Sequence, residues 1–160
     1  MEITSKQNSY IKEYRKLVEQ RKYRRQSGFF PCEGAKLAVE AVKSGCTLGE
    51  NAYVTVSAED KYPNVVGMLR EQCKVVRISE EVADSISDTK SPQGIFITVR
   101  HLDKILNLST IDSSRQFIIL ENLQDMGNIG TIIRSCDAFS IDGVIPVSYT
   151  HLTLPTKLEV

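Results

Sequence analysis

The stretch FIILENLQDMGNIGTIIRSCDAF, residues 117–139, decides how the second half of the chain folds. It opens with FIIL, a short apolar run of β-forming residues that is typical of a strand buried on both faces. Apolar residues then recur at helical spacing and predict a helix with one buried face. These residues are Ile129, Ile132, Ile133, Cys136 and Phe139. DGVIPV (142–147) predicts a second strand, so the loop before the helix lies at the carboxyl end of a parallel strand, where open α/β sheets bind ligands.

The glycines of this loop do not form a nucleotide cradle. GNIG (127–130) has Gly-x-x-Gly spacing, which matches neither a dinucleotide fingerprint nor a phosphate-binding loop followed by Lys and Ser or Thr. Two polar residues of the stretch have both structural and functional interpretations. Asn128 is a candidate helix cap. Arg134 is a candidate for a surface ion pair with Asp125 or Asp137. The residues alone leave these interpretations open.

Upstream, residues 1–100 alternate between helical and strand patterns and predict a small α/β/α sandwich. A first helix is expected within TSKQNSYIKEYRKLVEQRKYRRQSG (4–28), with Gly28 as its stop. The next helix turns Leu37, Ala38, Ala41 and Val42 inward and ends at Gly45. The other expected elements are an extended segment at 29–32, strands at 51–57, 74–79 and 95–99, and helices at 65–73 and 80–88. Residues 101–115 are expected to form a linker, and residues 116–146 to open a second domain.

The charge of the chain is unevenly distributed. The net charge is zero, yet residues 1–27 hold eight Lys and Arg against three Glu. Tyrosines lie among these cations, a composition that suits single-stranded nucleic acid, because bases stack on aromatic rings and phosphates pair with cations. The alternative is an ordinary solvated face of an amphipathic helix. The candidate RNA-binding residues are Lys6, Lys12, Arg15, Lys16, Lys22, Arg24 and Arg25.

Composition excludes several other classes of protein. The four cysteines are widely separated and never form Cys-x-x-Cys, so neither a zinc ribbon nor a redox pair is expected, and we predict reduced, mostly buried thiols. Neither His101 nor His151 has carboxylate or thiol residues at metal-ligand spacing in the sequence, so no metal site is predicted. No apolar run approaches the roughly 20 residues needed to span a bilayer. The charged start of the chain lacks the apolar core of a signal peptide, which favours a cytoplasmic protein.

At this point the motifs carry a family resemblance. ENLQDMGNIGTIIRSCDAF (121–139) resembles the first motif of the SpoU (TrmH) RNA ribose 2'-O-methyltransferases, which runs Gln-Asp-Pro-x-Asn-x-Gly-x-x-x-Arg and continues to Ala-Phe-Gly. Segments 3–17, 29–45 and 87–99 resemble the family's substrate-binding domain, a ribosomal-protein-like α/β/α module. Three positions depart from the motif, where Met126 replaces Pro, Cys136 replaces Ala and Ser140 replaces Gly.

The resemblance implies methyl transfer from S-adenosylmethionine to a ribose 2'-hydroxyl of rRNA or tRNA. It also implies a small α/β/α substrate-binding domain followed by the start of an α/β-knot methyltransferase domain, with a homodimer for the full-length protein. Asn128 and Arg134 match motif residues at the reaction centre. A guanidinium is a poor base, so we expect Arg134 to clamp phosphate and stabilise the developing alkoxide, while Asn128 holds the loop and the ribose.

Beyond DGVI the sequence departs from the family. The second and third motifs, which form the cofactor pocket, are not present in PVSYTHLTLPTKLEV (146–160). VSYTHLTLPT corresponds to a transposase adapter of sequencing libraries translated in frame, so residues 147–160 are expected to be an adapter-derived tail. We therefore expect a truncated methyltransferase of about residues 1–145, inactive alone and without a cofactor site. An exposed FIIL strand without its sheet neighbours predicts poor solubility of that half. The alternative function is a non-catalytic RNA-binding module.

Overall fold

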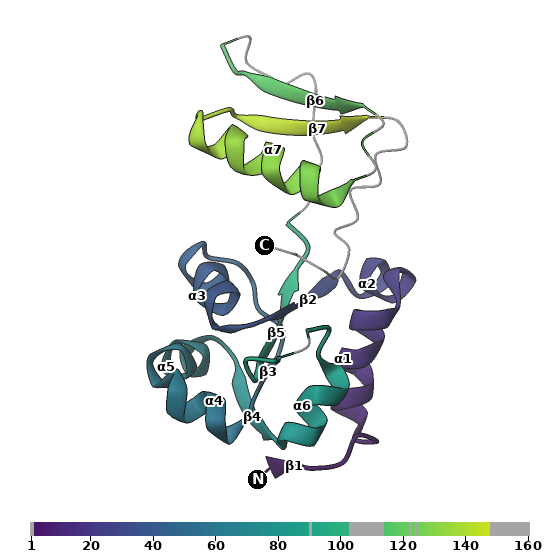
Figure 1. Ribbon diagram of the computed structural model, residues 1–160, viewed down its shortest axis with the longest axis vertical. Coiled ribbons are helices and arrows are strands. Elements are labelled where there is room, and N and C mark those ends of the chain that lie inside the picture. The colour runs from purple at the N-terminus through teal and green to yellow at the C-terminus, as the bar shows by residue number, and fades with distance from the viewer. Residues whose placement is uncertain (1, 90, 103–113, 122, 124, 148–160) are drawn as a thin grey trace. The chain divides into compact units, whose positions relative to one another are not determined.

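The computed structural model describes residues 2–89, 91–102, 114–121, 123 and 125–147 (Figure 1). The chain divides into two compact units, Met1–Asp103 and Lys104–Val160, each with a sheet of its own. The elements of the first unit are β1 (Glu2–Ile3), α1 (Ser9–Glu19), α2 (Arg21–Ser27), β2 (Phe29–Glu33), α3 (Ala35–Lys43), β3 (Asn51–Val54), α4 (Val56–Lys61), α5 (Pro63–Gln72), β4 (Lys74–Ile78), α6 (Glu80–Ile86) and β5 (Ile95–Arg100). Those of the second unit are β6 (Phe117–Glu121), α7 (Met126–Ala138) and β7 (Gly143–Val147).

The first unit is built on a five-stranded mixed sheet in the order β1-β4-β3-β5-β2. β1 and β3 pair with β4 in parallel, whereas β5 pairs antiparallel with both β3 and β2. Helices α3, α4 and α5 cover one face of this sheet, and α1 and α6 cover the other (Figure 1). The predicted α/β/α sandwich is therefore confirmed.

Successive side chains of the central strands point to opposite faces of the sheet, which divides the apolar core into two parts. In β3, Ala52 and Val54 face the α3 side while Tyr53 faces the α1 side. In β5, Phe96 turns toward α1 between Ile95 and Ile97, which turn toward α3. The α3-side core consists of Cys32, Ala35, Ala38, Ala41, Ala52, Val54, Ala58, Val66, Leu69, Ile95, Ile97 and Val99. The α1-side core consists of Ile11, Tyr14, Tyr53, Ile78, Val82, Ala83, Ile86 and Phe96.

The single helix predicted at the start of the chain is wrong in one respect, because the structure breaks it into α1 and α2. Gln20 adopts an extended conformation (φ −117°, ψ 103°) and ends α1. The break releases carbonyls of the last turn of α1, and the Arg24 guanidinium donates to the Leu17 and Val18 oxygens at 2.7 and 3.0 Å. Gly28 ends α2 in the left-handed conformation (φ 73°), as predicted.

Two further differences have local causes. The strand predicted at 51–57 ends at Val54, because the Thr55 hydroxyl accepts a hydrogen bond from the Ala58 amide and caps α4, which the sequence patterns did not predict. The strand β1 was not predicted either. It has two residues, and its pairing with β4 is a long-range contact that leaves no periodic pattern.

A surface ion cluster of the first unit offers a test by pH. Glu59 pairs with Arg70 and, at 2.7 Å between Nε and Oε2, with Arg77. Hydrogen bonds from Arg77 and then Arg70 lower the pKa of Glu59. Its contribution to stability is therefore complete above the unfolded-state pKa and is lost as the pH falls through the lower folded-state pKa.

We expect Glu59→Gln to reduce the free energy of unfolding at pH 7 by less than about 1 kcal/mol, since exposed ion pairs are weak. The difference from wild type should shrink as the pH falls through the folded-state pKa of Glu59 and be absent below it. Urea unfolding over a series of pH values from 7 downward measures it, with the exposed Glu71→Gln as the matched control. If the difference in unfolding free energy between Glu59→Gln and wild type persisted unchanged at low pH, it would not come from the ionised carboxylate of Glu59.

The second unit contains the predicted strand–helix–strand arrangement. β6 and β7 pair in parallel, from Phe117 opposite Gly143 to Glu121 opposite Val147, with α7 between them in sequence (Figure 1). The prediction that FIIL is buried on both faces is wrong. Leu120 is buried, but Ile119 on the opposite face is 64% exposed. The physical reason is that the described sheet has two strands and α7 covers only one face.

The apolar stripe of α7 is also only partly buried. Ile129 and Cys136 are buried and Ile132 is half-buried, whereas Ile133 and Phe139 are exposed. A two-stranded sheet is too narrow to cover the whole stripe. The expected solubility defect of this half stays a prediction, and the proposed tail, from 148 onward, lies outside the described residues, as does most of the proposed linker (103–113).

Candidate functional site

The loop between β6 and α7 ends in a helix cap. The Asp125 carboxylate accepts hydrogen bonds from the amides of Gly127 and Asn128 at 2.7 and 3.3 Å. It thereby satisfies two of the amides that the first turn of a helix leaves unpaired. The interpretation of Asn128 as the cap is wrong, because Asp125 holds that position and Asn128 lies inside the first turn.

Arg134 is directed back along α7 toward this same end. Its Nη2 donates to the Thr131 hydroxyl at 3.1 Å, and that hydroxyl donates to the Gly127 carbonyl at 2.9 Å. Gly130, one turn before Arg134, leaves the space beside the guanidinium open, since a methyl group there would lie 3.5 Å from Nη1. The guanidinium is thus positioned by a chain of two hydrogen bonds.

Asn128, in the first turn of α7, and Arg134, two turns further along, both have exposed side chains. In the described part of the chain, Arg134 forms no ion pair with Asp125 or Asp137, so the salt-bridge interpretation is wrong. A guanidinium on the helix that follows a parallel strand can bind a phosphate through its fork of N–H donors.

The basic N-terminal segment contains most of the other candidate residues. Lys12 and Lys16, four residues apart, share the solvent face of α1, opposite its buried residues. Arg15 is half-buried and donates to the Ser85 hydroxyl at 3.0 Å. The candidates with exposed side chains are Lys6, Lys12, Lys16, Lys22 and Arg25.

Arg24 differs from the other candidates. Its side chain is only 9% exposed, its guanidinium is bonded to the carbonyls at the end of α1, and burial lowers its pKa. The structure therefore corrects its assignment to an RNA-facing surface. This residue joins α2 to α1.

The adjacent pair Arg24 and Arg25 provides a direct test. Arg24→Ala should lower the free energy of unfolding by about 1–3 kcal/mol, because it leaves carbonyls at the end of α1 without their hydrogen-bond donor. Arg25→Ala should leave stability unchanged and weaken RNA binding with a smaller salt dependence, because it removes one exposed cation. Thermal unfolding and RNA titrations at several salt concentrations separate the two effects. Equal stability of both variants would refute the structural role of Arg24.

The described residues offer neither a metal site nor a membrane-spanning helix. They contain no group of three or more His, Cys, Asp or Glu placed to hold a metal ion. No helix among them is long and apolar enough to cross a membrane. The four cysteines are free thiols, and Cys32 and Cys136 are buried, as predicted, whereas Cys46 and Cys73 are half-buried. Burial raises the pKa of Cys32 to about 12.

Comparison with known proteins identifies the first unit. Residues 8–96, from the cap of α1 into β5, match the family described as the MRM3-like substrate-binding domain. The chain belongs to this family. The MRM3-like domain thus accounts for more than half of the 160 residues, and its limits fall inside the α/β/α sandwich.

Relatives extend the similarity beyond the MRM3-like domain into the second unit. The chain is 29% identical over 144 residues to the 23S rRNA (guanosine(2553)-2'-O)-methyltransferase RlmP of Bacillus subtilis, covering 90% of this chain and 53% of that protein. It is 32% identical to an uncharacterised tRNA/rRNA methyltransferase of Synechocystis, covering 89% of this chain and 51% of that one. The resemblance to SpoU (TrmH) RNA 2'-O-methyltransferases is confirmed by these homologues.

A solved structure supports the same placement. The AdoMet-bound rRNA methyltransferase of Sinorhizobium meliloti superposes with a TM-score of 0.73 at 26% identity, covering 92% of this chain and 54% of that chain. The chain spans about half the length of the relatives it matches.

Sequence reasoning found Asn128 and Arg134 but missed the residues that place them. Asp125 lies immediately before the helical pattern, and an acidic residue there is a recognisable capping signal. Thr131 lies three residues before Arg134 on the predicted helix, a spacing that brings side chains together and could have indicated the contact.

Proposed function

We propose that this chain contributes the RNA-binding and first catalytic parts of an S-adenosylmethionine-dependent ribose 2'-O-methyltransferase that acts on rRNA or tRNA. The observation that carries the proposal is the combination of an MRM3-like substrate-binding domain with the Arg134–Thr131 hydrogen bond on α7. The similarity to proteins named as RNA methyltransferases supports it.

Within this proposal Arg134 binds the phosphate next to the target ribose and stabilises the alkoxide as the 2'-hydroxyl loses its proton to phosphate or water. Asn128 orients the ribose from the first helical turn. Thr131 is a positioning residue, since it acts only by directing the guanidinium.

S-adenosylmethionine would supply the methyl group. In the described residues of the second unit, Ile119 lies exposed on one face of a two-stranded sheet. We therefore assign no cofactor contact to them. Because the chain spans about half the length of its relatives, we propose that activity requires the equivalent of their remaining segments. We further propose a cytoplasmic homodimer for that longer protein.

The proposal is tested by sequencing the source locus across the codon of Ile145, expressing the complete reading frame and incubating the protein with RNA and methyl-labelled S-adenosylmethionine. The expected product after nuclease digestion is a labelled 2'-O-methylnucleoside. RNA binding without any labelled nucleoside would instead support the non-catalytic RNA-binding module. A locus that encodes residues 147–160 followed by a stop would refute the adapter origin of the tail.

A further inference from the structure

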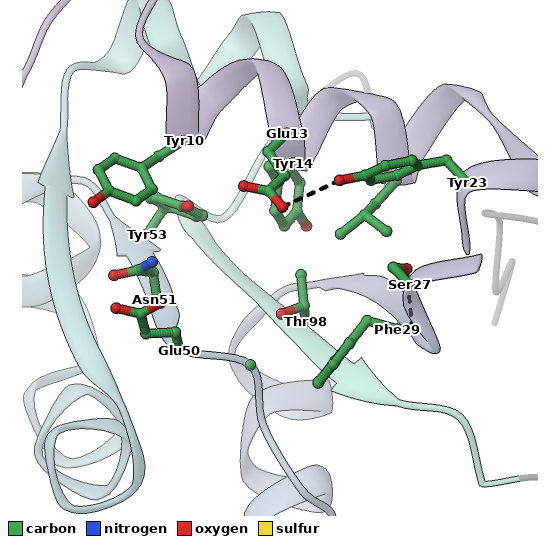
Figure 2. A pocket seen from close by; sticks show the side chains of 12 residues that line it. Tyr10, Glu13, Tyr14, Tyr23, Ser27, Phe29, Glu50, Asn51, Tyr53 and Thr98 are labelled. Carbon is green, nitrogen blue, oxygen red and sulfur yellow. Dashed lines mark hydrogen bonds between the residues drawn. The ribbon is translucent and has the colours of Figure 1, made fainter. Parts of the chain in front are cut away.

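A pocket of about 310 Å³ opens on the α1 face of the first unit's sheet (Figure 2). It lies beside the part of this face that α1 and α6 cover, over the start of β3 and the outer part of β5. Its lining residues come from α1, α2, the start of β2, the segment entering β3, β3 itself and β5. The volume lies at the lower end of the range for small-ligand pockets, which suits one nucleobase better than a larger ligand.

Aromatic rings form much of the wall. Tyr10 and Tyr53 lie together at one end, and Tyr23 and Phe29 lie toward the other (Figure 2). Tyr53 is buried, Tyr23 and Phe29 are half-buried, and Tyr10 is 47% exposed. Aromatic rings gathered around one hollow are a feature on which unpaired bases stack.

The polar groups of the pocket are mainly acceptors. Glu13 enters from α1 and Glu50 from the segment before β3, while Asn51 and Thr98 add an amide and a hydroxyl (Figure 2). The Tyr23 hydroxyl donates to Glu13 Oε1 at 3.1 Å, which leaves the other oxygen available. Burial, with the nearby negative charge of Glu13 and others, raises the pKa of Tyr53 to about 12, so its hydroxyl stays neutral.

No Lys or Arg is among the lining residues of the pocket, but two cations lie next to its aromatic rings. The Lys16 ammonium lies 5.7 Å from the centre of the Tyr23 ring, and the Arg100 guanidinium lies 5.8 Å from that of Phe29. The pocket is thus acidic and aromatic within and flanked by positive charge. That distribution matches a nucleotide whose base is inserted and whose phosphates stay outside.

We propose that this pocket binds a single unpaired base of the RNA substrate, and that it prefers guanine. Guanine presents adjacent N–H donors on one edge that a carboxylate of Glu13 or Glu50 can accept together, and an O6 acceptor that the Asn51 amide can meet. Uracil presents one N–H between two carbonyl oxygens, and a carboxylate facing this edge would be repelled by these oxygens. The inference rests on the proposed function, because it names the feature of RNA that the substrate-binding domain recognises.

The test uses the whole chain and four short oligouridylates that differ only at the central base, which is G, A, C or U. Binding is followed through intrinsic tyrosine fluorescence, since the chain has six Tyr and no Trp. We expect the oligonucleotide with central G to bind most tightly. Tyr10→Ala should weaken this binding about 5- to 100-fold through lost stacking, whereas Tyr10→Phe should bind like wild type.

Glu50→Gln should remove the preference for G over U without abolishing binding, and Glu71→Gln, on the opposite face of the sheet, should change neither. Thermal melting confirms that each variant is folded. Equal binding of the four oligonucleotides, or wild-type affinity of Tyr10→Ala, would overturn the pocket assignment while leaving the methyltransferase proposal intact. Displacement of the RNA by tetramethylammonium at lower concentrations than by guanosine monophosphate would instead identify a cage for organic cations. The methyl-transfer assay with the complete protein fails or succeeds independently of these results.

Discussion

Arg134→Ala in the complete protein is expected to lower the rate of methyl transfer by about 10²–10³-fold, the effect of removing one preorganised group that stabilises a developing oxyanion. The guanidinium is exposed and held by the Thr131 hydroxyl alone among the described residues, so its loss should not disturb the fold. Single-turnover transfer of a labelled methyl group, at saturating RNA, measures the effect directly. Unchanged melting temperature of the variant confirms that the defect is chemical.

Two further variants separate charge from position. Arg134→Lys keeps a positive charge but cannot form a bidentate contact, so it should restore only part of the activity. Thr131→Val keeps the volume and removes the hydroxyl that directs the guanidinium, so it should lower kcat more than it changes KM for RNA. Full turnover by Arg134→Ala would eliminate Arg134 from the reaction centre.

Phe96→Ala is expected to destabilise the first unit by about 3–5 kcal/mol, the usual cost of replacing a buried phenylalanine. Phe96 is fully buried, and its ring packs edge-on against Tyr14 with the ring centres 6.0 Å apart. The cavity would open where α1, β3 and β5 meet, and these elements cannot close it without breaking the alternation of the sheet.

Urea unfolding followed by tyrosine fluorescence is a suitable measurement, because five of the six tyrosines lie in the first unit. Phe139→Ala is the matched control. It removes the same side chain from a position that is 79% exposed, so the unfolding free energy of the first unit should change by less than about 0.5 kcal/mol. Comparable losses in the two variants would mean that Phe96 is not the centre of that core.

The two units differ in how far their sequences predicted their structures. In the first unit Ala38 and Ala41 of α3, predicted to turn inward, are buried, because α3 packs against a five-stranded sheet, while Leu37 and Val42 are half-buried. In the second unit the same kind of pattern overestimated burial at Ile119 and Phe139. A hydrophobic period indicates which face of an element can be buried. Whether that face is buried depends on the strands and helices that pack against it.

Local patterns were sufficient for most of the elements, the helix stop at Gly28 and the motif around Asn128 and Arg134, because caps, turns and periods depend on residues close in sequence. They were not sufficient for α4, β1 or the break between α1 and α2. Burial of Arg24 required the break at Gln20, which frees the carbonyls that its guanidinium meets. The pocket required contacts between side chains separated by up to about 90 positions, from Tyr10 to Thr98, which only the packing of helices on the sheet brings together.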